Sequence, residues 1–133
     1  MDSMMMDMMS KNGMTMPGMS ATDMSVMQAC MDACSAAEQA CTVCAMEMMS
    51  CAPACMNCAA MCDTMLRSML RMQGMTRDTM MSMLDTTMAM CQMCMDKCMA
   101  DADDNEVCKM CAQSCKACID ACMALKDSMM KMA

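Results

Sequence analysis

The sequence predicts an all-α protein: an antiparallel up-down-up-down four-helix bundle with a cysteine-lined core and a methionine-rich N-terminal tail. Cysteines recur at helical spacing in four separate stretches of the chain. Glycine and proline, which interrupt helices, occur only 3 and 2 times in 133 residues. Methionine, a good helix former that fills irregular spaces in a core, occurs 34 times. One bundle with helices of about 20–25 residues accounts for a chain of this length.

The clearest cysteine pattern runs from Cys108 to Cys122, with successive cysteines 3, 4, 3 and 4 positions apart. At about 100° per residue, these side chains fall within an arc of about 80° on one face of an α-helix. In a strand, whose period is 2, they would be scattered over both faces. Three other stretches repeat the pattern, one of them with Ala37 in the skipped turn. The four stripes are Cys30, Cys34, Cys41 and Cys44; Cys51, Cys55, Cys58 and Cys62; Cys91, Cys94 and Cys98; and Cys108, Cys111, Cys115, Cys118 and Cys122.

Residues 1–24 are predicted to be a Met-rich, largely flexible segment, and residues 25–133 to be the bundle domain. Pro17 and Gly18 break any helix in the first segment. Its many thioethers are soft neutral ligands suited to Cu(I). The alternative is a low-complexity leader without a role.

The first two helices are predicted over about residues 22–48 and 51–72. Thr22 or Asp23 is expected to cap the first helix, because short polar side chains accept hydrogen bonds from its free amides. Pro53 implies a break just before it, since proline is tolerated only in the first turn of a helix. Gly74 is expected near the C′ position that ends the second helix.

The last two helices are predicted over about residues 77–100 and 106–130. Thr76 can cap the third helix, and Asp78 favours its positive end. The acidic segment 101–105 forms the last loop and supplies the cap of the fourth helix. Because every connection is short, neighbouring helices must be antiparallel.

This topology sorts the core along the bundle axis, from thiols at one end to thioethers at the other. Cysteines such as Cys34 and Cys118 lie in between. The thiol end collects Cys41, Cys44, Cys51, Cys55, Cys94, Cys98, Cys108 and Cys111. The other end collects Val26, Met27, Met65, Met69, Met80, Leu84, Thr87, Leu125 and Met129.

The charge and hydropathy of the chain exclude several classes of partner. A net charge of −7 argues against nucleic acid and against an anionic membrane surface, because binding to either needs clusters of Lys and Arg. No run of 18 uncharged apolar residues is present, so no membrane insertion is expected. The N-terminus lacks the basic and apolar regions of a signal peptide, which favours the cytoplasm; a leader removed from a precursor would favour the periplasm or export.

Packing, disulfides and metal binding are the three explanations for 16 cysteines on inward faces. Packing explains them poorly, because Cys is smaller than Leu and a Cys-lined core would leave destabilising voids. Disulfides also fit poorly, since helix axes lie about 8–10 Å apart and many facing Cα pairs would exceed the limit of about 7 Å. Many cysteines in a chain without an export signal point to metal before disulfides.

Thiolates are soft ligands, and the pattern favours Cu(I) over other soft metals. Structural zinc prefers isolated tetrahedral sites, and an iron–sulfur ferredoxin would show C-x-x-C-x-x-C-x-x-x-C-P, which is absent. Cu(I) accepts two or three sulfurs, which a pair at i and i+4 and a neighbouring stripe can supply. One Cu(I) per thiolate keeps a dry core neutral, which predicts roughly 8–16 ions per chain.

Thiol stripes on all four helices, in C-x-x-x-C and C-x-x-C-x-x-x-C runs, resemble those of the bacterial copper storage proteins, a family of cysteine-rich four-helix-bundle copper-binding proteins. The matching runs are residues 51–62 and 108–122, with 91–98 and 30–44 as partners. The resemblance implies Cu(I) storage inside the bundle, a homotetramer, and a protein that is cytosolic or exported after folding. Family members often place His at the metal entrance; this chain has none, and Met65, Met69, Met80 and the Met-rich tail are the expected substitutes.

The predicted function is therefore storage and detoxification of Cu(I), with the sixteen cysteines and these three methionines as metal ligands. An enzyme is not expected, since the chain offers no His base and no Ser–His or Cys–His pair. A copper chaperone or transfer protein is one alternative, but it needs a single exposed, exchangeable site. A metallothionein-like buffer for Zn or Cd is the other, and it differs in the preferred metal.

Overall fold

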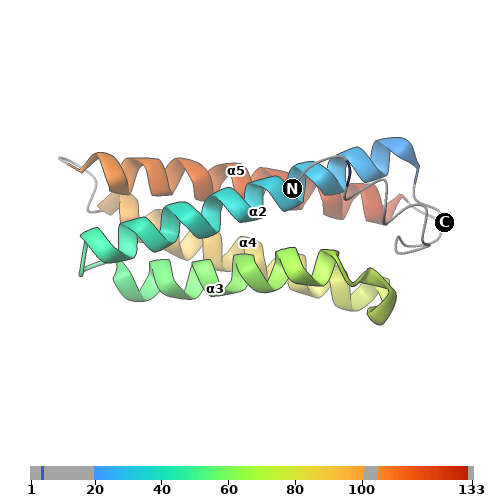
Figure 1. Ribbon diagram of the computed structural model, residues 1–133, viewed down its shortest axis with the longest axis horizontal. Helices are drawn as coiled ribbons and strands as arrows, with labels where there is room; N and C mark the ends of the chain where they lie inside the picture. Colours follow the sequence, from blue (N-terminus) through green and yellow to red (C-terminus); the bar gives the residue numbers. More distant parts are fainter. Residues whose placement is uncertain (1–3, 5–19, 101–104, 132–133) are drawn as a thin grey trace.

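The computed structural model describes Met4, residues 20–100 and residues 105–131. In this part of the chain the structure is an elongated bundle of α-helices (Figure 1), with no strand, so the predicted all-α bundle is confirmed. The predicted flexible segment over residues 1–24 falls mostly outside the described residues and stays a prediction. The elements are α2 (Ala21–Glu47), α3 (Ala52–Met69), the 3-10 turn η1 (Met72–Gly74), α4 (Arg77–Ala100) and α5 (Glu106–Met130).

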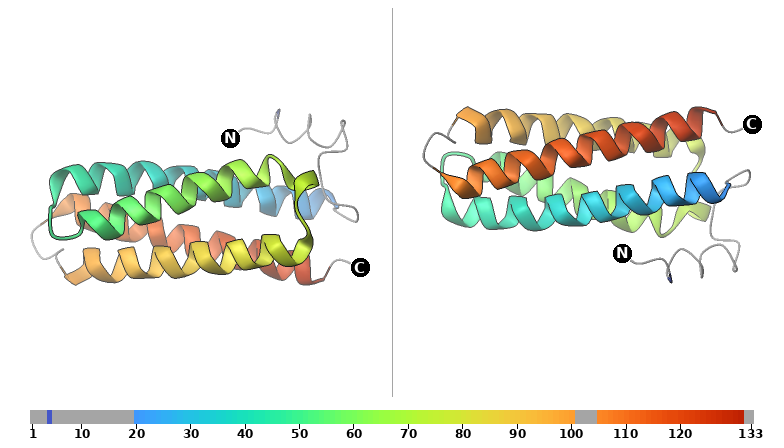
Figure 2. Two further views of the ribbon diagram at one scale, coloured as in Figure 1. Left: turned by 90° about the horizontal axis from the view of Figure 1, so that it is seen from below. Right: turned by 90° about the horizontal axis from the view of Figure 1, so that it is seen from above.

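The four helices form a ring in which each packs against two neighbours. α2 packs against α3 and α5, and α4 packs against the same two helices. The α2–α3 turn lies at one end of the bundle, together with the end of α4 and the start of α5 (Figure 2). The α3–α4 turn lies at the other end, together with the start of α2 and the end of α5. The up-down-up-down topology therefore sorts the core along its axis as predicted.

α2 begins at Ala21, one residue earlier than predicted, and its N-cap is Ser20. The Ser20 hydroxyl accepts from the Asp23 N–H at 3.1 Å, and the Asp23 carboxylate accepts from the Ser20 N–H at 3.0 Å. Thr22 and Asp23 were the wrong residues for the cap, because this reciprocal capping box places Asp23 in the first turn and satisfies two amides together.

α3 ends earlier than predicted, at Met69 rather than about residue 72. Its last turn tightens through i→i+3 bonds from the Leu70 N–H to the Arg67 carbonyl at 3.2 Å and from the Arg71 N–H to the Ser68 carbonyl at 3.0 Å. The chain then enters η1, which contains Gly74. The expectation that Gly74 follows the end of the helix directly is therefore wrong.

The remaining helix starts follow the sequence prediction. Pro53 lies in the first turn of α3. The Thr76 hydroxyl accepts from the Thr79 N–H at 3.1 Å and caps α4. The Asn105 side chain accepts from the Cys108 N–H at 2.9 Å and caps α5. Short polar side chains thus fix where both helices begin, and so the axial position of their cysteines.

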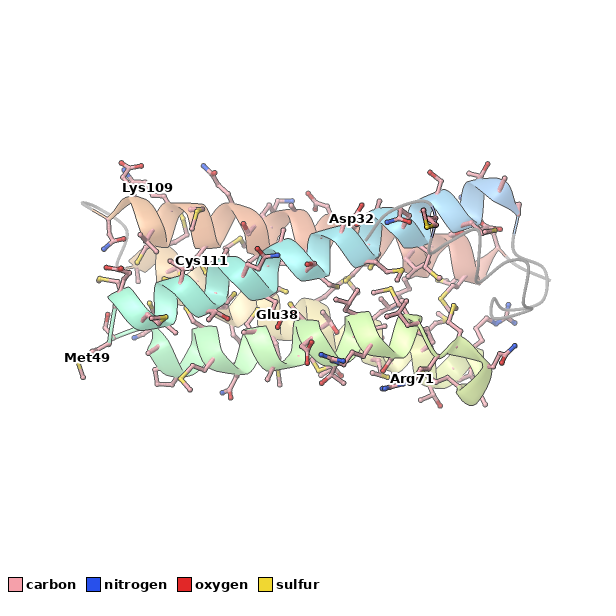
Figure 3. All side chains as sticks on the ribbon, in the orientation of Figure 1. Asp32, Glu38, Met49, Arg71, Lys109 and Cys111 are labelled. Atoms are coloured by element: carbon pink, nitrogen blue, oxygen red, sulfur yellow. The ribbon has the colours of Figure 1, made fainter. Side chains whose placement is uncertain are left out.

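The core contains sulfur side chains almost throughout, and the charged residues lie outside it. In the described part of the chain the buried polar side chains are Ser68 and Thr87. Asp32, Arg71 and Lys109 point away from the bundle (Figure 3). Within the described ranges, no helix has both the length and the apolar character needed to cross a membrane.

Candidate metal centre

All sixteen cysteine side chains have exposed fractions of 0%, and all are free thiols. Each of the four stripes lies on the inner face of the bundle, because the 3, 4 spacing keeps its cysteines on one face of the helix. Ala37 fills the skipped turn of the first stripe and is also fully buried. The sequence prediction of four inward-facing thiol stripes is therefore confirmed.

Every cysteine Sγ atom lies within 4.0 Å of at least one other cysteine Sγ atom, and the contacts join all four helices. The distances are 3.5 Å for Cys44–Cys51; 3.6 Å for Cys58–Cys91, Cys55–Cys94 and Cys41–Cys111; 3.7 Å for Cys30–Cys122, Cys34–Cys118, Cys41–Cys94, Cys41–Cys115 and Cys55–Cys98; 3.8 Å for Cys44–Cys98, Cys44–Cys108 and Cys94–Cys111; 3.9 Å for Cys62–Cys91; and 4.0 Å for Cys58–Cys62 and Cys58–Cys115.

These contacts form an unbroken path of thiols along the bundle axis. The path starts at Cys51, beside the α2–α3 turn, and reaches Cys62 in the second half of α3. Two further pairs, earlier in α2 and later in α5, extend the thiol-lined region toward the other end. In order, the path is Cys51, Cys44, Cys98, Cys55, Cys94, Cys41, Cys115, Cys58 and Cys62.

The spacing of the thiols fits soft-metal coordination. At a metal–sulfur bond of about 2.3 Å, three ligands in a plane lie about 4.0 Å apart, and two ligands on a line about 4.6 Å apart. Five groups of three or four Sγ atoms lie within 4.8 Å of one another, and Cys118 joins them through Cys34. The groups are Cys41, Cys94, Cys111 and Cys115; Cys44, Cys55, Cys98 and Cys111; Cys30, Cys34 and Cys122; Cys44, Cys51 and Cys108; and Cys58, Cys62 and Cys91.

Neighbouring thiols and burial shift the pKa values of the cysteines in opposite directions. Hydrogen bonds with Cys122 and then Cys34 lower the pKa of Cys30 to about 5. Burial is the main cause that raises the pKa of Cys44 and Cys98 above the ordinary value of a thiol. A thiol of the first kind offers a thiolate readily, whereas one of the second kind must lose a proton as metal binds.

The metal-free protein is expected to lose stability as the pH rises above about 9. Burial raises the pKa of Cys55, and the hydrogen bond with Cys111 raises the pKa of Cys94 to about 12, from an ordinary value of 9.0. Because the pKa of such a thiol is higher in the folded than in the unfolded chain, its protonated form stabilises the fold below pH 9. This contribution is lost as the pH rises from about 9 to about 12. Cys30, with a lowered pKa, already contributes fully above pH 9 and does not offset the loss.

Anaerobic urea unfolding at pH 8, 9.5 and 11 measures this dependence. The metal-loaded protein is the control, because coordinated thiolates carry no exchangeable proton. A metal-free protein whose unfolding midpoint stays constant over this range contradicts the assignment of buried, protonated thiols.

The three methionines predicted at the metal entrance are fully buried at the end opposite the α2–α3 turn. Met65 and Met69 lie at the end of α3, and Met80 lies in the first turns of α4. Sequence reasoning missed two other fully buried thioethers at this end, Met31 and Met72. Met31 follows Met27 by four positions, so its periodicity could have identified it. Met72 lies in η1, but it continues the 3, 4 spacing of Cys62, Met65 and Met69, so the same periodicity could have identified it.

The other residues predicted at this end are buried, except for one. Val26 is partly exposed, because it lies at the edge of the inner face of α2. The remaining members have exposed fractions of 0% or 1%: Met27, Leu84, Thr87, Leu125 and Met129. The predicted change from thiols to thioethers along the core is therefore confirmed.

A model of the copper storage protein family (Csp) matches residues 18–127, which include every cysteine of the chain. The chain belongs to the copper storage protein family. No curated protein sequence matches it. Storage of copper rather than catalysis is the role that membership of this family implies.

Two solved structures of copper storage proteins from Streptomyces lividans are similar to this one. A cytosolic copper storage protein with five coppers is 27% identical, with a TM-score of 0.76 over 81% of this chain and 98% of that chain. The protein Ccsp loaded with 10 copper equivalents is 26% identical, with a TM-score of 0.78 over 92% of this chain and 98% of that chain. The present chain therefore covers nearly the full length of both solved structures.

Proposed function

We propose that this chain stores many Cu(I) ions in its core, with all sixteen cysteines as ligands. The observation that carries the proposal is the path of Sγ contacts at 3.5–4.0 Å, which uses all four helices and is closed to solvent. A thiolate in such a path can bridge two ions, so successive sites share ligands. The copper equivalents bound by the two relatives from Streptomyces lividans support the same function.

Charge sets the expected capacity at roughly 8–16 ions per chain, nearer the upper end. Two thiolates with one Cu(I) leave a net charge of −1 in a dry core, which is costly when it is repeated along the bundle. No buried cation in the described part of the chain balances such charges, since its buried polar side chains are Ser68 and Thr87. One Cu(I) per thiolate leaves the core neutral.

The alternative functions receive less support. A copper chaperone needs a thiol site exposed to its partner, and every cysteine here has an exposed fraction of 0%. A buffer for Zn or Cd would use the same thiols but prefers separate tetrahedral sites over a shared path. Glu38, a carboxylate near the edge of the first cysteine stripe, is partly exposed, and no titrating His faces the core, because the chain has none.

Met65, Met69 and Met80 are proposed to conduct Cu(I) into the store rather than to hold it. Thioethers are neutral, so an ion among them keeps its full positive charge in an apolar environment. Such an ion is more stable among the thiolates farther along the axis. A homotetramer is proposed from the family resemblance. A location in the cytosol is proposed from the cytosolic relative.

Anaerobic titration of the reduced protein with Cu(I), in competition with Zn(II), tests this function. We expect saturation at roughly 8–16 equivalents of Cu(I), measured by metal analysis and native mass spectrometry, with Zn(II) displaced. Saturation at one or two equivalents would contradict storage. Retention of Zn(II) against Cu(I) would instead favour the zinc buffer.

A further inference from the structure

Met48 lies at the C-terminal cap of α2, at the end of the bundle opposite Met65, Met69 and Met80. Three hydrogen bonds hold it. Its N–H donates to the Cys44 carbonyl at 2.9 Å, and its carbonyl accepts from the Cys51 thiol at 3.6 Å. Its Sδ atom accepts from the Asn105 side-chain amide at 3.1 Å. The hydrogen bond from Asn105 fixes the position of the Met48 sulfur. A methionine that only filled space in the core would not need such a bond.

The same contacts attach Met48 to one group of thiols. Cys44, Cys51 and Cys108 have Sγ atoms within 4.8 Å of one another. Met48 bonds to the first two through its backbone, and Asn105 links it to the third by capping the Cys108 N–H at 2.9 Å. One asparagine side chain therefore positions both the thioether and a thiol of the group.

Exposure distinguishes Met48 from the sulfurs around it. The three thiols have exposed fractions of 0%, whereas Met48 packs against the core and is also partly exposed. Met49, the next residue, is 91% exposed and points away from the bundle at the tip of the turn (Figure 3). Met48 is thus a thioether that packs against the buried core and is also in contact with solvent.

We propose that Met48 is an exchange ligand at this second end of the store. It passes Cu(I) between the group of Cys44, Cys51 and Cys108 and a low-molecular-weight thiol in solution. The proposal rests on the storage function. Cu(I) keeps its oxidation state throughout: the incoming thiol gives up its proton and binds the ion, and the protein thiolate that releases the ion takes up a proton. A neutral thioether suits this step, because it binds Cu(I) without adding a charge that would retain it.

Chelator challenge of the loaded protein tests the proposal. Wild type, Met48→Leu and Met49→Leu are loaded anaerobically, their copper content is measured, and excess dithiothreitol is added as the small thiol. Leu keeps the apolar volume of Met48 but has no sulfur ligand. We expect equal loading, removal slowed by about ten-fold or more in Met48→Leu, and wild-type removal in Met49→Leu.

Asn105→Ser supplies an independent variant. Serine still caps α5 but is too short to hold the Met48 sulfur, so slowed removal is expected with the thioether present. Full loading with wild-type rates in both Met48→Leu and Asn105→Ser overturns the proposal and leaves storage intact. Slowed removal only in a triple Met65→Leu, Met69→Leu, Met80→Leu variant also overturns it. A wild-type capacity of one or two ions overturns storage, and the exchange role with it.

Discussion

Loading with Cu(I) is expected to raise the melting temperature of this protein by tens of degrees. The core lacks the aliphatic and aromatic volume of an ordinary bundle, since its buried hydrophobic residues include sixteen Cys but only two Leu, Leu84 and Leu125. Each site held at a hundred times its dissociation constant adds about 2.7 kcal/mol to the stability of the fold. Eight such sites would add about 20 kcal/mol, less whatever the unfolded chain recovers by binding metal through its own thiols.

A gain of this size exceeds the whole stability of a typical domain, which is about 5–15 kcal/mol. Anaerobic melting curves from far-ultraviolet circular dichroism, at zero, half and full loading, measure the shift. Removal of the metal with a strong Cu(I) chelator should return the curve to that of the metal-free protein. Coincident curves with and without Cu(I) would count strongly against a core that is completed by metal.

Substitution of the central four-thiol group by serine is expected to remove about a quarter of the copper capacity and to break the path of thiols. The group comprises Cys41, Cys94, Cys111 and Cys115. Without it, no Sγ contact within 4.0 Å joins the thiols near the α2–α3 turn to those around Cys58. At one Cu(I) per thiolate, four of 16 ligands correspond to about four ions.

Native mass spectrometry after anaerobic titration measures this capacity, and circular dichroism verifies the helices. A matched control replaces four exposed methionines, one on each helix, by leucine: Met46, Met56, Met93 and Met123. The control is expected to keep the full capacity, because these side chains lie outside the core. Unchanged capacity in the serine variant would show that the central thiols are not ligands, and an alanine variant separates lost ligands from buried hydroxyls.

The inward faces of the helices and most of their caps depend on local properties of the sequence, and these features were predictable. The 3, 4 spacing depends only on the 3.6-residue turn, so it identified the inward face of every helix, down to Ala37 in the skipped turn. The cap at Thr76 followed from residue type, and Asn105 lies in the segment that was predicted to supply the cap of the last helix. Residue type alone does not identify Ser20, because its carboxylate partner at the third position of the helix, Asp23, is also a residue type that caps helices.

Where each helix ends, and which residues of different helices meet, was harder to predict than which face of each helix points inward. The end of α3 at Met69 rather than at Met72 depends on the i→i+3 bonds that replace the α-helical ones in its last turn. No short-range pattern contains this information. Likewise, Met48 and Asn105 are 57 positions apart, and the hydrogen bonds that each makes with nearby residues do not indicate that their two side chains meet.

The sequence by itself determined the fold class, the thiol and thioether ends of the core, and the soft-metal chemistry, because periodicity and ligand type are local properties of the residues. Only the tertiary structure decided which thiols meet. One residue of axial shift between two helices moves a side chain by about 1.5 Å, which is enough to lose a contact of 3.7 Å such as Cys41–Cys94. The relative position of the helices is set by the packing of the whole core and by the caps at both ends. The path of thiols, and the position of Met48 beside its first members, depend on that packing.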